Sequence, residues 1–109
     1  MQEAARGKVE AVRAAAARGV ILAEATNLAR DLSNEPSNHL TPSDLAAKAA
    51  DVAKENGLEL EVLERADMEA KGMGSLLSVA KGSAQPPKLV RLSYKGRGGE
   101  GYDLALVGK

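Results

Sequence analysis

The sequence predicts an α/β fold: a partial, mixed and mostly parallel sheet flanked by helices. Apolar residues recur at three- and four-residue spacing over the first third of the 109-residue chain, and short alternating or continuous apolar runs follow later. Helical stretches separate these runs, and the order helix, strand, helix, strand is typical of parallel βαβ units. The core must be built from Ala, Leu, Val, Ile and Met, since the chain has two Tyr and no Phe or Trp.

The first third predicts one long helix, from about Gln2 or Val9 through Asn34. This stretch is rich in Ala, Glu and Arg and contains no proline. It carries two apolar stripes that are out of phase: Val9, Val12, Ala16, Val20 and Ala23, then Ile21, Ala25, Leu28 and Leu32. Gly19 is the weakest helix former between them, so we expect a kink or break there.

A turn and a second helix follow. Asn, Pro and Ser cluster over residues 33–42, which predicts a turn. Thr41 can cap the next helix, Pro42 suits its first position, and Asp44 completes a capping-box pattern. Gly57 then supplies a left-handed stop. The stripe predicted to be buried consists of Leu45, Ala49, Val52 and Ala53.

Shorter elements fill the middle of the chain. The alternating run Leu58–Val62 predicts an edge or near-edge strand. Residues Asp67–Lys71 predict a helical turn that ends at Gly72. Leu76–Ala80 and Lys88–Tyr94 predict two further strands.

The last apolar run, Leu104–Val107, predicts a strand buried on both faces, and Gly108 and Lys109 follow it. Open α/β sheets place their chemistry just beyond the carboxyl ends of such strands. A lysine amine binds a metal only when it is deprotonated, which burial favours. From the residues alone, Lys109 is nearly always a solvated side chain at such a position, and a metal-ligand role is the less common alternative.

Composition argues against several partners. Fifteen basic and fifteen acidic residues give a formal net charge of +0, so no long-range field attracts nucleic acid or an anionic membrane. The apolar stretch Gly19–Ala23 is too short to span a bilayer. Cysteine is absent, which excludes thiolate metal sites and fits a cytoplasmic location. We predict no nucleic-acid partner and no membrane partner.

Other motifs have plainer structural explanations. The run 34–38 offers Glu35 as a base, but Asn, Ser and Pro there more often cap and turn the chain. His39 is the only histidine, and one histidine alone makes a poor metal site. The glycines of 96–99 join two predicted strands rather than cradling a phosphate, and 72–74 is a helix stop. No catalytic and no cofactor-binding residue is predicted.

Several segments, in order, resemble the leucyl aminopeptidase family of dinuclear-metal exopeptidases. The resemblance covers roughly Ile21 to Lys109. It is carried by Ala29–Pro42, Gly72–Leu77, Gly82–Leu89, Leu92–Gly96 and the final Val107-Gly108-Lys109. Ordered agreement of this kind is more specific than any single short motif.

The resemblance implies that residues 1–109 are the N-terminal portion of a leucyl-aminopeptidase-like catalytic domain, a truncated domain. The family is implied to be a cytosolic metalloprotease, a homohexameric hydrolase whose proteolysis removes N-terminal amino acids from peptide substrates. Two divalent ions, zinc or manganese, are implied, with Lys109 matching a ligand lysine. Because the other ligands of the pattern would follow Lys109, we expect this chain alone to bind no metal tightly and to be inactive.

A second hypothesis treats the chain as a non-catalytic α/β scaffold or interaction module derived from that domain. An in-frame continuation of the family pattern after Lys109 would favour the enzyme, and a natural stop codon there would favour the module. In either case we expect self-association, since the apolar run Leu104–Val107 would lack part of its cover.

Overall fold

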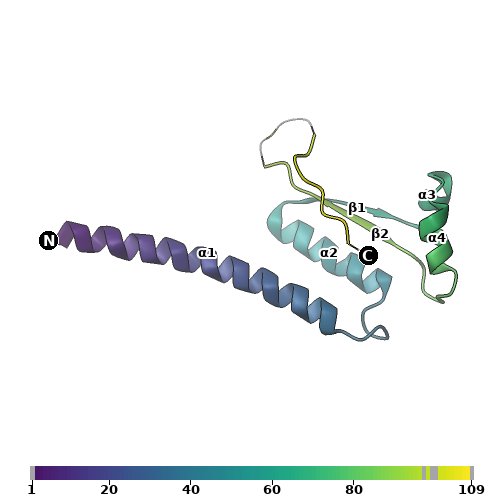
Figure 1. The fold of residues 1–109 in the computed structure, drawn as a ribbon, viewed down its shortest axis with the longest axis horizontal. Helices are drawn as coiled ribbons and strands as arrows, with labels where there is room; N and C mark the ends of the chain where they lie inside the picture. The colour runs from purple at the N-terminus through teal and green to yellow at the C-terminus, as the bar shows by residue number, and fades with distance from the viewer. Residues whose placement is uncertain (1, 97, 99–100, 109) are drawn as a thin grey trace. The chain divides into compact units, whose positions relative to one another are not determined.

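The computed structural model describes residues 2–96, 98 and 101–108, and side chains from residue 7 onward. Figure 1 shows the elements in chain order, which are α1 (Gln2–Asn34), α2 (Pro42–Asn56), β1 (Glu59–Leu63), α3 (Arg65–Ala70), α4 (Gly74–Ala80) and β2 (Leu89–Ser93). The chain divides into two compact units, Met1–Ser37 and Asn38–Lys109. The α/β prediction is confirmed at this coarse level.

The first unit is the helix α1. It runs for 33 residues without interruption, so the predicted helix through Asn34 is confirmed and the predicted break at Gly19 is wrong. A glycine costs a helix only about 1 kcal/mol relative to alanine. The alanine-rich residues on both sides of Gly19 supply enough propensity to carry the hydrogen-bond ladder through it.

A turn over residues 35–40 connects the two units along the chain, and α2 follows it in the second unit, so the predicted turn and second helix are confirmed. The Asp44 N–H donates to the Thr41 hydroxyl at 3.3 Å, and the Thr41 N–H donates to the Asp44 carboxylate at 2.9 Å. Pro42 occupies the first turn, where no N–H is needed. At the other end Gly57 has a φ of 64°, a left-handed conformation that glycine adopts without strain.

The sheet has two strands among the described residues. β1 and β2 pair antiparallel, with Glu61 opposite Arg91 and Leu63 opposite Leu89, and α2 packs against both strands. The two strands predicted at Leu58–Val62 and Lys88–Tyr94 are confirmed to within one residue at each end. A parallel βαβ unit is not formed in the described part of the chain, because the connection through α3 and α4 returns β2 antiparallel to β1.

The predicted strand Leu76–Ala80 is wrong, since these residues belong to α4. The run Leu-Leu-Ser-Val-Ala has no alternation that would give a strand one apolar face, and its Leu77 N–H bonds the Met73 carbonyl at 3.1 Å in helical fashion. The predicted helical turn Asp67–Lys71 is confirmed as α3, which starts two residues earlier. Gly72 ends it at a φ of 69°.

The predicted buried strand Leu104–Val107 is also wrong for this chain. These residues have no regular secondary structure, and Leu106 and Val107 are 89% and 95% exposed. A strand buried on both faces needs a hydrogen-bonding neighbour and cover on each side. The described residues supply neither, so the apolar run has no regular secondary structure and is exposed.

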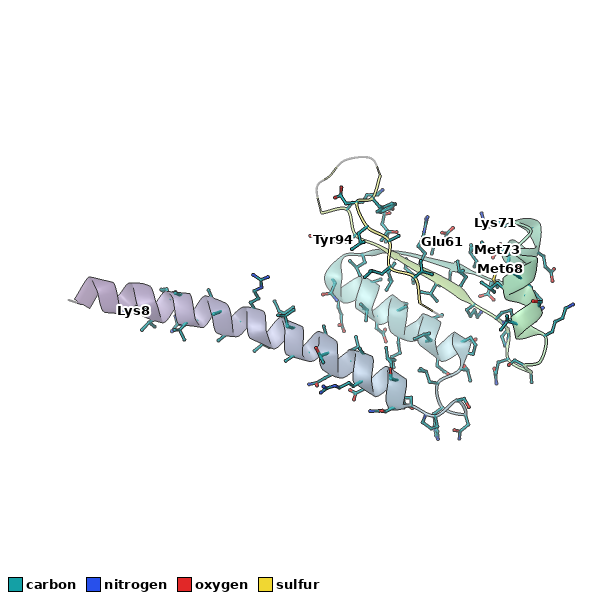
Figure 2. All side chains as sticks on the ribbon, in the orientation of Figure 1. Lys8, Glu61, Met68, Lys71, Met73 and Tyr94 are labelled. Atoms are coloured by element: carbon teal, nitrogen blue, oxygen red, sulfur yellow. The ribbon has the colours of Figure 1, made fainter. Side chains whose placement is uncertain are left out.

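The best-buried side chain of the described residues is Met68, which is fully inaccessible to solvent. Leu63 at the end of β1, Ala53 on α2 and Pro87 before β2 are also buried. Figure 2 shows Met68 and Met73 close together at α3 and α4. Met68 lies on α3, which contacts both α4 and β1, and its flexible thioether side chain suits an irregular space of this kind.

Candidate functional site

The one residue predicted to hold a metal, Lys109, lies outside the described residues. The strand expected to deliver it is not formed, as the exposed Leu104–Val107 run shows. Its role as a ligand therefore stays a prediction.

The described residues do not by themselves assemble a two-metal site. Within the described ranges there is no group of three or more His, Cys, Asp or Glu side chains close enough together to hold a metal ion. Lys109 adds one amine, whereas tetrahedral metal sites in proteins take about four ligands. No catalytic step through a metal can be assigned to these residues.

The polar run after α1 ends the helix and turns the chain, as the alternative to an active-site loop predicts. The Glu35 N–H donates to the Asp31 carbonyl at 3.0 Å and so extends the end of the helix. Residues 33–39 are all exposed, His39 among them. Exposed polar side chains of this kind are typical of a solvated turn.

Gly72 ends a helix, and Gly96 and Gly98 lie in a loop. The Gly72 N–H donates to the Glu69 carbonyl at 3.0 Å, and the Met73 N–H donates to the Met68 carbonyl at 2.9 Å, which satisfies carbonyls at the end of α3. Of the loop 96–99, only Gly96 and Gly98 are described. A side chain at Gly96 would meet the Tyr94 ring at 2.7 Å, so glycine there lets the ring lie over the backbone.

The sequence analysis missed a set of ion pairs between the two strand segments. Arg91 Nε lies 3.0 Å from the Glu61 carboxylate, and Lys95 Nζ lies 3.3 Å from that of Glu59. Lys88 pairs with Glu64, and its side chain is only 15% exposed. The signal was present as three acids in residues 59–64 and three bases in residues 88–95, but it becomes informative only once the pairing of the strands is known.

No helix in the described part of the chain is both long enough and apolar enough to cross a lipid bilayer. This includes α1, whose 33 residues would suffice in length. Its apolar residues are interrupted by charged ones.

The comparison with protein families decides what kind of chain this is. Residues 27–109 match the model of the cytosol aminopeptidase family, catalytic domain. The chain belongs to the cytosol aminopeptidase family. The match begins near the end of α1 and covers all of the unit from Asn38 onward.

Curated relatives in the cytosol aminopeptidase family agree with this assignment. The chain is 54% identical over 104 residues to a probable cytosol aminopeptidase of Solibacter usitatus (strain Ellin6076), which covers 94% of this chain and 22% of the relative. It is 53% identical over 91 residues to one of Alkaliphilus metalliredigens (strain QYMF), covering 84% of this chain and 18% of the relative. The chain thus spans about a fifth of the length of these relatives. No solved structure matches it.

Family membership confirms the resemblance noted in the sequence. Residues 27–109 correspond to part of the catalytic domain of that family. The relatives are about five times as long as the matched segment, so most of a family catalytic chain has no counterpart here.

Proposed function

We propose that residues 1–109 form the N-terminal portion of the catalytic domain of a metal-dependent leucyl aminopeptidase that hydrolyses N-terminal amino acids from peptides. The observation that supports this most strongly is the family match over residues 27–109. Aminopeptidase activity belongs, in this proposal, to the complete enzyme, and these residues alone are inactive.

The role of this portion is to build scaffold rather than to supply reacting groups. The capped helix α2, the antiparallel pair β1–β2 and the buried Met68 are interactions that the chain makes with itself. In the complete domain, Leu104–Val107 becomes a strand of a larger, mostly parallel sheet. That strand carries Lys109 to the edge where the site forms.

Two divalent ions, zinc or manganese, act in the complete enzyme, which is a cytoplasmic homohexamer acting on peptides. When bound, such ions activate water and polarise the scissile carbonyl. Lys109 contributes one ligand as a neutral amine, and the other ligands come from residues outside this chain. Burial beside the ions is what would lower the lysine pKa far enough.

The absence of a ligand cluster from the described residues also suits the second candidate, a non-catalytic scaffold or interaction module. The two proposals differ in what the segment does inside an enzyme. A chimera separates them: this segment replaces the matched segment of the Solibacter usitatus relative, with which it is 54% identical.

The first proposal predicts that the chimera hydrolyses leucine p-nitroanilide and binds zinc or manganese. Lys109→Ala in the chimera should lower both metal content and activity, by about tenfold or more given typical effects of disturbing a metal shell. Lys95→Ala is the matched control, because it removes a lysine from the same region, and its effect should be small. A folded chimera that binds no metal, or one in which Lys109→Ala changes neither readout, would contradict the proposal.

A further inference from the structure

Helix α2 ends in the dipeptide Asn56-Gly57, which the proposed function does not use. Of the asparagines in the chain, Asn56 is the one that glycine follows. The peptide nitrogen of the next residue can attack an asparagine side chain at its carbonyl carbon, and glycine hinders this attack least because it has no Cβ. The sequence therefore makes Asn56 the most reactive asparagine.

The reaction is a deamidation with water and hydroxide as co-reactants. The Gly57 peptide nitrogen loses its proton to hydroxide, forms a bond to Asn56 Cγ, and the Cγ–Nδ2 bond breaks. The released NH2 group takes up a proton from water and leaves as ammonia, which regenerates hydroxide. A second water then opens the succinimide ring at either of its carbonyls and gives aspartate or isoaspartate.

In the structure both reacting groups are held in hydrogen bonds. The Gly57 N–H donates to the Ala53 carbonyl as the cap of α2, and Asn56 Nδ2 donates to the Val52 carbonyl at 2.9 Å. The succinimide contains neither donor, because the Gly57 nitrogen has no proton in it and Nδ2 has left. Both hydrogen bonds must therefore break before the ring can form, so the folded helix end protects Asn56.

The same helix end is exposed and joined by local contacts. Asn56 and Gly57 are exposed, and a Cβ built at Gly57 meets no atom within 4 Å. The Leu58 N–H also donates to the Ala53 carbonyl, at 2.9 Å. All of these hydrogen bonds lie within residues 52–58. Helix ends open at a much smaller free energy than the whole fold, so this turn can open by itself.

We propose that Asn56 is a deamidation site whose reaction is controlled by opening of the last turn of α2. Conversion takes place in the molecules in which this turn is open. The rate is therefore the rate of the unfolded chain multiplied by the open fraction. Because the hydrogen bonds of Gly57 and Asn56 both oppose opening, we expect the folded chain to convert about tenfold more slowly than the unfolded chain, or more slowly still.

The product alters the end of the helix. Aspartate at position 56 places a negative charge at the C-terminus of α2, where the helix dipole disfavours it. Isoaspartate adds a carbon to the main chain before Gly57 and so displaces the cap. Either product makes the formal net charge one unit more negative than +0, which ion-exchange chromatography resolves.

Incubation of the 109-residue chain in mildly alkaline buffer, with and without guanidinium chloride, tests the proposal. Trypsin releases the peptide 55–65, which contains Asn56 and no other asparagine or glutamine. Mass spectrometry of this peptide measures conversion, and we expect the folded rate to be about tenfold or more below the denatured rate. Equal rates would overturn the proposal, because the helix end would then give no protection. A folded chain that stays unconverted over many denatured half-lives would overturn it as well, because the turn would then not open.

Two glycine substitutions separate opening of the last turn from opening of the whole helix. Lys54→Gly weakens the last turn and should raise the ratio of folded to denatured rate about threefold. Lys48→Gly is the matched control, since it makes the same change at an exposed position earlier in α2 and should leave the ratio unchanged. If both substitutions raise the ratio equally, α2 opens as a whole and the proposal is wrong.

The peptide that reports on Lys54→Gly is 49–65, which also has no asparagine or glutamine besides Asn56. Dividing by the denatured rate of each variant removes any effect of the substitution on the reaction itself.

Asn56→Gln is the chemical control. It keeps a side-chain amide but needs a larger ring, so conversion in the peptide 55–65 should disappear. Conversion that persists in Asn56→Gln would show that another residue produces the signal, and the site would be wrong. Asn34 and Asn38 serve as references in the denatured chain, because the residues after them carry a Cβ. If either converts faster than Asn56 there, the assignment of the reactive asparagine is wrong.

Discussion

The amphipathic pattern of residues 42–56 predicts a helix, and the continuous apolar run Leu104–Val107 predicts a strand. Only the helix, α2, forms. Thr41, Asp44 and Gly57 satisfy the ends of α2 from within the chain, and Ala53 is buried. Leu104–Val107 has strong strand character and no partner among the described residues, and it remains exposed. The difference shows that an apolar sequence pattern is enough to form its element only where the residues that complete its hydrogen bonds and cover its apolar face lie nearby in the chain.

We expect the largest loss of stability from a substitution at Met68, the fully buried side chain on α3. Met68→Ala should lower the free energy of unfolding of the β1–α3 region by about 2 kcal/mol or more, since it leaves a cavity where a fully buried side chain stood. Amide hydrogen exchange of β1 residues measures this. Met73→Ala, at a half-buried site nearby, is the control and should cost less. Equal protection in Met68→Ala and the original chain would show that this core is not what holds the strands to the helices.

The cap of α2 is the next test of local specification. Thr41→Ala removes the hydroxyl that accepts the Asp44 N–H and should destabilise α2 by about 1 kcal/mol. Hydrogen exchange of the first turn reports the change. Ser43→Ala, an exposed neighbour with no capping bond described, should be close to neutral. If both substitutions have the same effect, the cap is not what fixes the start of the helix.

The same cap predicts a dependence on pH. Hydrogen bonds from the Thr41 hydroxyl, and then from the Thr41 N–H, hold the pKa of Asp44 below its ordinary value. A depressed pKa in the folded state means that this carboxylate stabilises α2 above the ordinary pKa of about 3.9, and that the stabilisation is lost as the pH falls through the folded value.

NMR titration of Asp44 and of the α2 amides checks this. The acid-dependent loss of α2 should be weaker in Asp44→Asn, which cannot titrate. An Asp44 pKa at or above the ordinary value would contradict the geometry of the cap.

The smallest effect is expected in the segment that lacks partners. Leu106→Gln should change the stability of this chain by less than about 0.5 kcal/mol, because the side chain is already 89% exposed. In the chimera with the Solibacter usitatus relative, the same substitution should cost several times more, as a buried strand loses an apolar side chain. A large effect in the isolated chain would show that the segment packs against a surface of its own.

These regions also show how far the sequence could be interpreted. The long helix, the capping box and the glycine stops were predictable, because each depends on residues within one turn of one another. The direction of β1 and β2 was not, since antiparallel pairing depends on the path of the intervening α3 and α4. Leu76–Ala80 was misassigned because a short apolar run suits a helix or a strand equally until its packing is known.

The candidate site was the least predictable part. Lys109 was singled out by its place after an apolar strand and by family resemblance, and it lies outside the described residues. The ion pairs Glu61–Arg91, Glu59–Lys95 and Glu64–Lys88 were invisible before the register was known. A site assembled from distant segments leaves little local signal in any one of them.

The most direct test of the account compares metal binding by this chain with metal binding by the chimera. Calorimetric titration with zinc or manganese should be flat for the chain, because the described residues hold no ligand cluster and Lys109 offers a single amine. The chimera should bind metal, and Lys109→Ala in the chimera should weaken that binding. Stoichiometric submicromolar binding by the chain alone would contradict the account, since it would place a complete metal site within these 109 residues.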